Sequence, residues 1–290
     1  MNIRQVSIAL LTLLVSPFVM AADILTTVPA THILATQLTQ GTPIEVKYLP
    51  PARYGVSRLE SWFSAKGEEV VEQEAPKATA VITIRSLWPQ DPSYAYLRDH
   101  NIRLVEVDAS QSISSTGSSV AALTLDDGST SIYAWLNPNN LGRMSKIIAD
   151  DLIRLWPQHK TVIHSNLQQA LTQSRKLIQQ QSDWFFEQDM EAVVLLSESL
   201  EDFAAGYQLF VVGRQYKAEL DWTTQDIEQL KGYLNEDPTV RVVTTRKVSE
   251  KLANIVGDKD RIIEVDSLDR MGRFKFKADS PLERWESRLR

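Results

Sequence analysis

Six side chains have the types and positions expected of a site for a small polar or charged ligand. They are Arg53, Tyr54, Tyr133, Ser197, Glu198 and Asp266. The Arg53 guanidinium suits pairing with a carboxylate or another oxyanion. The rings of Tyr54 and Tyr133 suit stacking on a planar or cationic group. Because Glu198 and Asp266 offer hard carboxylate oxygens, they are candidate ligands for a divalent metal such as manganese or magnesium.

Catalytic patterns are missing from the sequence. It shows no Ser-His-Asp arrangement, no histidine pair of the metal-hydrolase type and no Gly-rich phosphate loop. Its four histidines are His32, His100, His159 and His164. The last two are five residues apart, which places them off one helical face. We expect surface or packing roles for the histidines, with His32 the best placed for a cleft, and a protein that is not an enzyme.

The six candidate residues are positioned by two series of alternating strands and helices. Apolar, β-branched segments predict strands at 24–28, 44–48, 80–84 and 103–107, and again at 192–196, 208–212, 240–244 and 261–265. Helical patterns lie between them at 32–39, 57–74, 92–100, 200–205, 224–234 and 247–256. Strands that alternate with helices predict parallel sheets, so the fold class is α/β with two Rossmann-like lobes. Ligands of such sheets bind beyond the carboxyl ends of strands, which puts the candidate residues in a cleft between the lobes.

Two long helices are predicted between the lobes. Asn137 and Pro138 are typical of an N-cap and a first helical position, and Pro157 ends the apolar stripe that follows. The segment 160–187 contains neither Gly nor Pro. At the rise of an α-helix it would be roughly 40 Å long, enough to cross a domain. We therefore expect one long helix joining the lobes, with an N-terminal lobe at 22–158, a linking helix at 159–188 and a C-terminal lobe at 189–290.

The first residues are typical of a secretory signal peptide. Arg4 precedes an apolar run at 6–15, and small residues end at Ala21, so we expect cleavage after Ala21. The run is shorter than the roughly 20 residues of a membrane span. The chain contains no cysteine, which excludes a lipid-modified cysteine anchor. These features predict a protein of the periplasm, and a net charge of −6 without a basic cluster argues against nucleic-acid binding.

Four short motifs carry a resemblance to a known family. They are Leu49-Pro50-Pro51, Trp135-Leu136-Asn137-Pro138, Phe203-Ala204 with Tyr207-Gln208-Leu209, and Val265-Asp266-Ser267-Leu268. In this order and on this topology, the chain resembles the periplasmic receptors of zinc and manganese ABC importers. The resemblance implies a monomeric receptor that binds a small solute or a metal ion and delivers it to an ABC permease. It also implies a divalent metal ion as the transported ligand.

Most metal ligands of that family have no counterpart at the matching positions of this sequence. The family uses three histidines and one carboxylate, and only Asp266 matches this set. Tyr133 and Ser197 stand at two histidine positions, and Tyr54 or a near neighbour stands at the third. Zinc prefers imidazole, thiolate or carboxylate, and a phenol with a pKa near 10 is a poor ligand. Two alternatives stay open, which are a receptor for a non-metal or chelated ligand and a ligand-free periplasmic partner or sensor.

Overall fold

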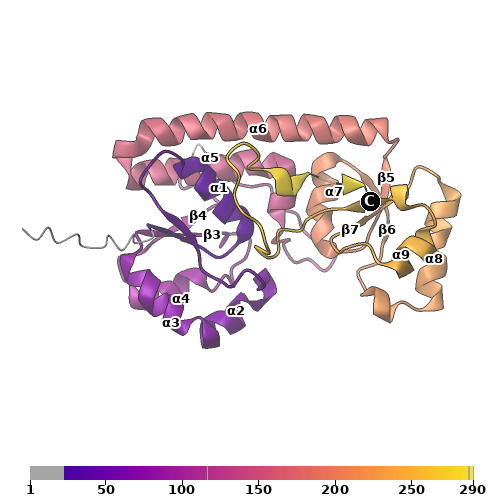
Figure 1. Cartoon of the computed structure of the whole chain (residues 1–290), viewed down its shortest axis with the longest axis horizontal. Helices are drawn as coiled ribbons and strands as arrows, with labels where there is room; N and C mark the ends of the chain where they lie inside the picture. Colours follow the sequence, from indigo (N-terminus) through magenta and orange to yellow (C-terminus); the bar gives the residue numbers. More distant parts are fainter. Residues whose placement is uncertain (1–22, 116, 287, 290) are drawn as a thin grey trace, which may run out of the picture.

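A computed structural model describes residues 23–115, 117–286 and 288–289. The predicted signal peptide at 1–21 lies outside the described residues. Two α/β lobes lie side by side, and one long helix runs along both of them (Figure 1). None of the described helices is both long and apolar enough to cross a membrane.

The first lobe contains a parallel sheet with the strand order β2-β1-β3-β4. Its strands are β1 (Ile24–Thr26), β2 (Val46–Tyr48), β3 (Ala80–Thr83) and β4 (Val105–Asp108). Its helices are α1 (Pro29–Thr39), α2 (Leu59–Ser61), α3 (Glu68–Glu74), α4 (Ser93–His100) and α5 (Pro138–Leu155). β1 and β3 are wholly buried, as expected of central strands covered by helices on both faces.

One predicted helix of this lobe is interrupted. The segment expected at 57–74 contains a 3-10 turn, the short helix α2, a π-helical turn at Trp62–Lys66 and then α3. The amide of Gly67 donates to the carbonyl of Trp62 at 2.7 Å, five residues back, and an added Cβ at Gly67 would lie 2.9 Å from the Trp62 ring. The wide turn thus lets the chain fold closely over the buried Trp62 side chain.

The second lobe contains a sheet with the strand order β6-β5-β7-β8-β9. Its strands are β5 (Ala192–Leu195), β6 (Phe210–Arg214), β7 (Arg241–Thr244), β8 (Ile262–Glu264) and β9 (Arg288–Leu289). Its helices are α7 (Glu201–Tyr207), α8 (Thr224–Glu236) and α9 (Glu250–Val256). The first four strands are parallel, as predicted, and β9 is antiparallel to β8.

The long helix α6 (Lys160–Glu187) has the range that the sequence predicts for a linking helix. Its buried side chains recur every three or four residues and form one stripe, as expected of a helix that packs on one side. They are Ile163, Leu167, Ala170, Ser174, Leu177, Gln181 and Phe185. The N-cap of α5 is also as predicted, because the Asn137 side chain accepts from the Asn139 amide at 3.0 Å.

The two lobes share one hydrophobic cluster. Trp135 from the first lobe is fully buried in it, together with Phe203 from α7 and Phe185 from α6. The indole Nε1 of Trp135 donates to the carbonyl of Ser267, which follows β8 in the second lobe, at 2.9 Å. A shared core of this kind opposes free rotation of one lobe against the other.

A segment after β8 leaves the second lobe, crosses to the first and returns (Figure 1). We call residues 269–286 the strap. The Gly272 amide donates to the carbonyl of Ala52 in the first lobe at 2.8 Å. Farther along, the indole of Trp285 is buried and donates to the Trp135 carbonyl at 2.8 Å. Part of the sequence assigned to the C-terminal lobe therefore lies against the N-terminal lobe.

Candidate functional site

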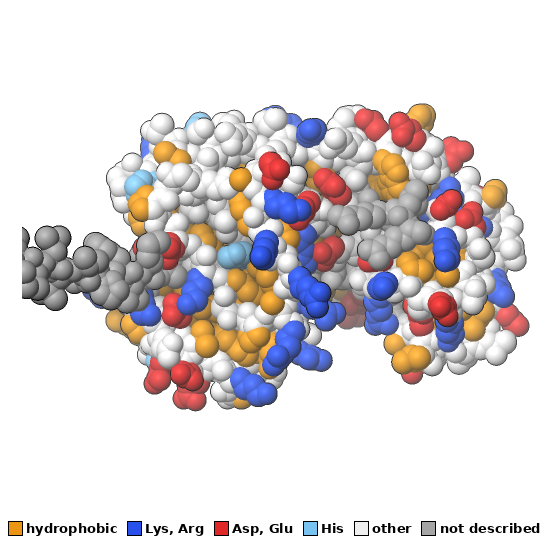
Figure 2. Space-filling view, in the orientation of Figure 1, with side chains coloured by type: hydrophobic (Ala, Val, Ile, Leu, Met, Phe, Trp, Pro, Cys, Tyr) orange, Lys and Arg blue, Asp and Glu red, His pale blue; other side chains and the backbone are white. Residues whose placement is uncertain are grey.

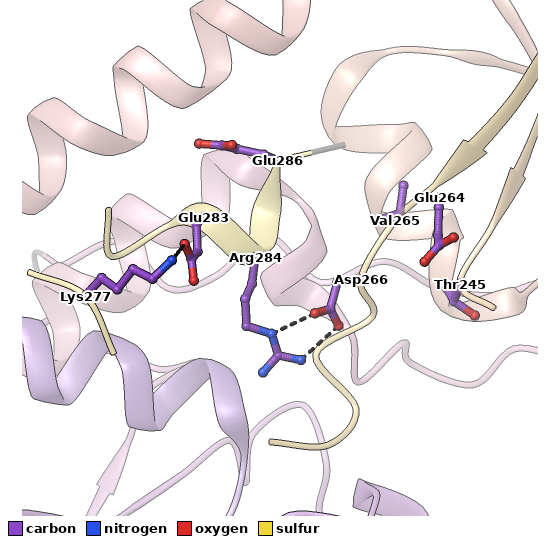
Figure 3. Close-up of a pocket in the computed structure, with 8 residues that line it drawn as sticks. All are labelled: Thr245, Glu264, Val265, Asp266, Lys277, Glu283, Arg284 and Glu286. Atoms are coloured by element: carbon purple, nitrogen blue, oxygen red, sulfur yellow. Dashed lines mark hydrogen bonds and ion pairs between the residues drawn. The ribbon is translucent and has the colours of Figure 1, made fainter. Parts of the chain in front are cut away.

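Asp266 lies directly after β8, at the strand end where the sequence predicts a ligand. Its carboxylate accepts from Arg284 Nε at 2.7 Å and from Arg284 Nη2 at 2.9 Å (Figure 3). It also accepts from the Leu268 amide at 2.8 Å. This bidentate pairing is the strong form of a carboxylate–guanidinium contact. The carboxylate that matches the resembling family is thus occupied by a cation of the chain itself.

The Arg284 guanidinium is held on several sides. Besides Asp266, it donates to the carbonyls of Arg270 at 3.0 Å and Met271 at 3.5 Å. Its central carbon lies 5.4 Å from the centre of the Phe274 ring, in cation–π distance. The Arg284 side chain is only 10% exposed, whereas that of Asp266 is 44% exposed. A divalent cation at Asp266 would have to displace this buried guanidinium.

A cavity of about 340 Å³ lies beside this ion pair, at the carboxyl ends of β7 and β8 (Figure 3). It is lined by Thr245, Glu264, Val265, Asp266, Lys277, Glu283, Arg284 and Glu286. Lys277 and Glu283, both on the strap, pair at 2.7 Å. The cavity is therefore polar, and four of its charged side chains form two ion pairs, Asp266–Arg284 and Lys277–Glu283.

Tyr133 and Asp269 form a second polar contact between the lobes. The Tyr133 hydroxyl donates to Asp269 Oδ1 at 3.3 Å, and the Val56 amide donates to the same oxygen at 3.1 Å. An added Cβ at Gly55 would lie 2.1 Å from Asp269 Oδ2, so only glycine leaves room for this carboxylate. Burial raises the pKa of Tyr133, and the charges of Asp269 and Glu198 raise it further. The phenol stays protonated at neutral pH and acts as a hydrogen-bond donor.

Arg53 and Tyr54 lie on the loop that follows β2. The Arg53 guanidinium is exposed and lies 5.6 Å from the centre of the half-buried Tyr54 ring. The Tyr54 amide donates to the Pro51 carbonyl at 2.8 Å, which closes a tight turn. The loop reaches Asp269 through its next two residues, Gly55 and Val56, so it lies at the junction of the lobes as the sequence predicts.

Ser197 and Glu198 lie after β5, beside a different cavity. The Ser197 hydroxyl contacts the Ser199 hydroxyl at 2.8 Å. Glu198 lines a cavity of about 140 Å³ together with Leu123, Thr124, Leu125, Asp126, Glu201, Arg214 and Tyr216. The two carboxylates predicted as metal ligands, Glu198 and Asp266, thus line separate cavities. Within the described residues no group of three or more His, Cys, Asp or Glu side chains is placed to hold a metal ion.

His32 is the histidine expected nearest the cleft. Its Nδ1 lies 3.0 Å from the Thr26 hydroxyl, and its ring meets the Tyr48 ring edge-on at 5.7 Å. Burial lowers the pKa of His32 to about 4, so the ring is neutral at physiological pH. Both partners belong to strands of the first lobe, which agrees with the expected packing role.

Asp202 is a buried carboxyl group that the sequence does not single out. It lies in the first turn of α7 and is 1% exposed. Burial raises its pKa to about 6; the Ser131 hydroxyl opposes this shift and the charge of Glu201 adds to it. Oδ2 has no hydrogen-bond partner in the described part of the chain. Near neutral pH the protein therefore keeps a poorly solvated charge at the edge of its shared core.

Replacement of Asp202 by asparagine is expected to change how stability depends on pH. The stabilising, protonated form of Asp202 is fully present below pH 3.8 and is lost as pH rises through about 6. Two pKa units correspond to about 3 kcal/mol. Urea unfolding measures the free energy of unfolding of both proteins. The value for the variant minus that for the wild type should rise by up to about 3 kcal/mol between pH 4 and pH 7.5. A stability difference that is the same at both pH values would contradict the expectation.

Comparison with known proteins identifies the family of the chain. The family model described as zinc-uptake complex component A, periplasmic, matches residues 57–277. The chain belongs to this family. Comparison with curated protein sequences gives no match. The family match confirms the expected metal-type receptor class, which is a class of solute-binding proteins and not of enzymes.

Solved structures show the same fold as this member of the zinc-uptake family. A crystal structure of ZnuA has a TM-score of 0.66 and 20% identity, and the match covers 90% of this chain and 94% of that one. AdcAII of Streptococcus pneumoniae has a TM-score of 0.65 and 14% identity, with 91% and 95% covered. The metal-dependent lipoprotein YcdH of Bacillus subtilis has a TM-score of 0.67 and 14% identity, with 87% and 90% covered. The predicted two-lobed fold is confirmed.

Sequence reasoning missed three residues at this site, namely Asp269, Arg284 and Trp285. Asp269 directly follows the resembling segment Val265-Asp266-Ser267-Leu268, and nothing in its local pattern indicates that it reaches the other lobe. Arg284 and Trp285 lie in a segment without helical or strand periodicity. The one sequence signal for a packed strap was the alternation of basic and aromatic residues at 273–277, which is unusual for a surface loop.

Proposed function

We propose that this chain is the solute-binding component of an ABC importer and that its solute binds where the lobes meet. The observation that carries the proposal is the convergence of three segments on the strap. The loop after β2 reaches it through Val56, the segment before α5 reaches it through Tyr133, and β8 leads directly into it through Asp266. Ligand sites of open α/β sheets lie at such strand ends.

The side chains at this junction favour a solute that is not a bare zinc ion. Tyr133 and Ser197 replace imidazole with hydroxyl groups, and Asp266 already pairs with Arg284. Hydroxyls and a neutralised carboxylate are weak substitutes for the imidazole and thiolate ligands of tight zinc sites. We propose a monomeric receptor of the periplasm that hands a chelated metal or a small polar solute to a membrane permease.

A second candidate function is a ligand-free partner or sensor with a receptor fold. The Asp269 contacts to Val56 and Tyr133 favour it because they join the lobes without any solute, and the Asp266–Arg284 pair favours it because it occupies the carboxylate after β8. In this case the strap would be a permanent part of the interface between the lobes.

Native mass spectrometry of protein purified from its own periplasm separates the two functions. A receptor should carry a bound solute, or its melting temperature should rise with one member of a panel of divalent metals, metal chelates and small polar molecules. Asp269→Asn alters the carboxylate that accepts from Val56 and Tyr133 at the junction and should change that response, while Glu228→Gln on the exposed face of α8 should leave it unchanged. Absence of any bound mass and of any shift across the panel would favour the ligand-free partner.

A further inference from the structure

The junction of the lobes is bordered by positive charges that the chain does not neutralise. Five exposed cations make up this basic rim: Arg53 and Arg58 on the loop after β2, and Arg270, Arg273 and Lys275 on the strap. Within the described residues, no carboxylate lies within ion-pair distance of any of them. The whole chain has 37 acidic and 31 basic residues. A cluster of unpaired cations therefore differs from the net acidic composition of the chain.

Backbone hydrogen bonds hold the two halves of the rim together. Gly272 of the strap donates to Ala52 at 2.8 Å, and Val56 donates to the carbonyl of Asp269 at 3.1 Å. Arg53 lies between these two contacts in the sequence. Figure 2 shows Lys and Arg side chains gathered along the face of the first lobe and over the space between the lobes. The rim is thus one surface built from segments more than 200 residues apart.

The strap presents its cations outward by simple alternation. Phe274 and Phe276 are half-buried and pack against the shared hydrophobic cluster, while Lys275 between them is exposed. Alternate side chains of an extended segment point to opposite sides. The two phenylalanines therefore anchor the strap, and the lysine between them faces solvent.

The acidic groups behind the rim do not cancel it. Asp266 is neutralised by Arg284, and Asp269 is bound by the Val56 amide and the Tyr133 hydroxyl. A surface cluster of charges of one sign attracts ligands of the opposite sign. The cavity itself is lined by four carboxylates and two cations. The unpaired positive charge of the junction therefore lies on the rim outside the cavity, where it suits an anionic group better than a bare metal cation.

We propose that the solute is a small anion with several carboxylate-type groups, either free or as an anionic metal chelate, and that the basic rim holds it. This rests on the proposed receptor function and names its substrate class. Guanidinium groups of Arg53 and Arg273 match carboxylates in a bidentate geometry. A chelate brings its own metal ligands, which removes the need for imidazoles at Tyr133 and Ser197.

Calorimetric titration with four probes tests the proposal: citrate alone, zinc chloride alone, zinc with excess citrate, and polyglutamate. The wild type should bind citrate or zinc–citrate more tightly than zinc alone, and added salt should weaken this binding. The double variant Arg53→Gln/Arg273→Gln should bind at least about tenfold more weakly, as expected from the loss of two charged hydrogen bonds. The matched double variant Lys176→Gln/Lys231→Gln removes two exposed cations from α6 and α8 and should bind like the wild type.

Each other outcome has a defined meaning. Equal binding by the rim variant and the wild type would overturn the proposal, as would tighter binding of zinc alone. Binding of polyglutamate without binding of citrate would assign the rim to an acidic macromolecule and also overturn it. In these cases the receptor function still stands if any panel solute binds at the junction. Failure of every panel solute would instead count against the receptor function itself.

Discussion

Replacement of Trp285 by alanine is expected to lower the free energy of unfolding by about 3–5 kcal/mol, the range for large aromatic side chains in cores. Trp285 is only 5% exposed and packs in the cluster that both lobes share. Its indole also donates to the Trp135 carbonyl at 2.8 Å. The variant loses buried apolar area, leaves a cavity and releases the strap from the first lobe.

Urea unfolding monitored by circular dichroism measures this effect. Trp285→Phe keeps an aromatic ring and loses the hydrogen bond, so it should cost less than Trp285→Ala. Leu220→Ala, at a side chain that is 93% exposed, is the control and should have almost no effect. If Trp285→Ala were as stable as Leu220→Ala, the strap would not be part of the folded core.

Replacement of Arg284 by alanine is expected to detach the two ends of the strap from each other and from Asp266. The guanidinium makes two bonds to Asp266 and one to the Arg270 carbonyl, each between 2.7 and 3.0 Å. Their loss should cost about 2 kcal/mol, because the freed Asp266 carboxylate is half-exposed and can be hydrated. Limited proteolysis should then cut within 269–286 faster than in the wild type.

Arg143→Ala provides the matched control for this experiment. Arg143 is an exposed arginine on α5, so the same change there should leave both stability and cleavage near those of the wild type. If Arg284→Ala kept the wild-type cleavage rate, the ion pair with Asp266 would not be what fixes the strap.

The eight parallel strands of the two sheets were predictable because most of them are buried and apolar, whereas the short antiparallel strand β9 was not predicted. β1, β3 and β5 are covered on both faces, and such strands read as short apolar runs. The helix α6 was predictable because apolar residues recur every three or four positions over 28 residues that contain neither Gly nor Pro. The boundaries of other helices were less accurate: α1 begins at Pro29 where residue 32 was predicted, and α9 begins at Glu250 where residue 247 was predicted.

The strap could not be predicted because its contacts are long-range and follow no period. Val56 and Asp269 are 213 residues apart, and Trp135 and Trp285 are 150 apart. The six predicted ligand residues illustrate the same limit. Five of them follow β2, β5 or β8, and Tyr133 lies in the segment before α5, yet the sequence did not show that Arg284 pairs with Asp266 or that Glu198 lines another cavity. Their roles in binding stay predictions.

The central claim is that this chain keeps the fold of the zinc-uptake family and does not keep its way of holding zinc. Competition with a chromogenic chelator on metal-free protein measures the zinc affinity directly, with Asp266→Asn measured beside the wild type. We expect no zinc site with a Kd below about 1 µM, which is a loss of several kcal/mol of binding free energy against a nanomolar site. A nanomolar site that disappears in Asp266→Asn would contradict it.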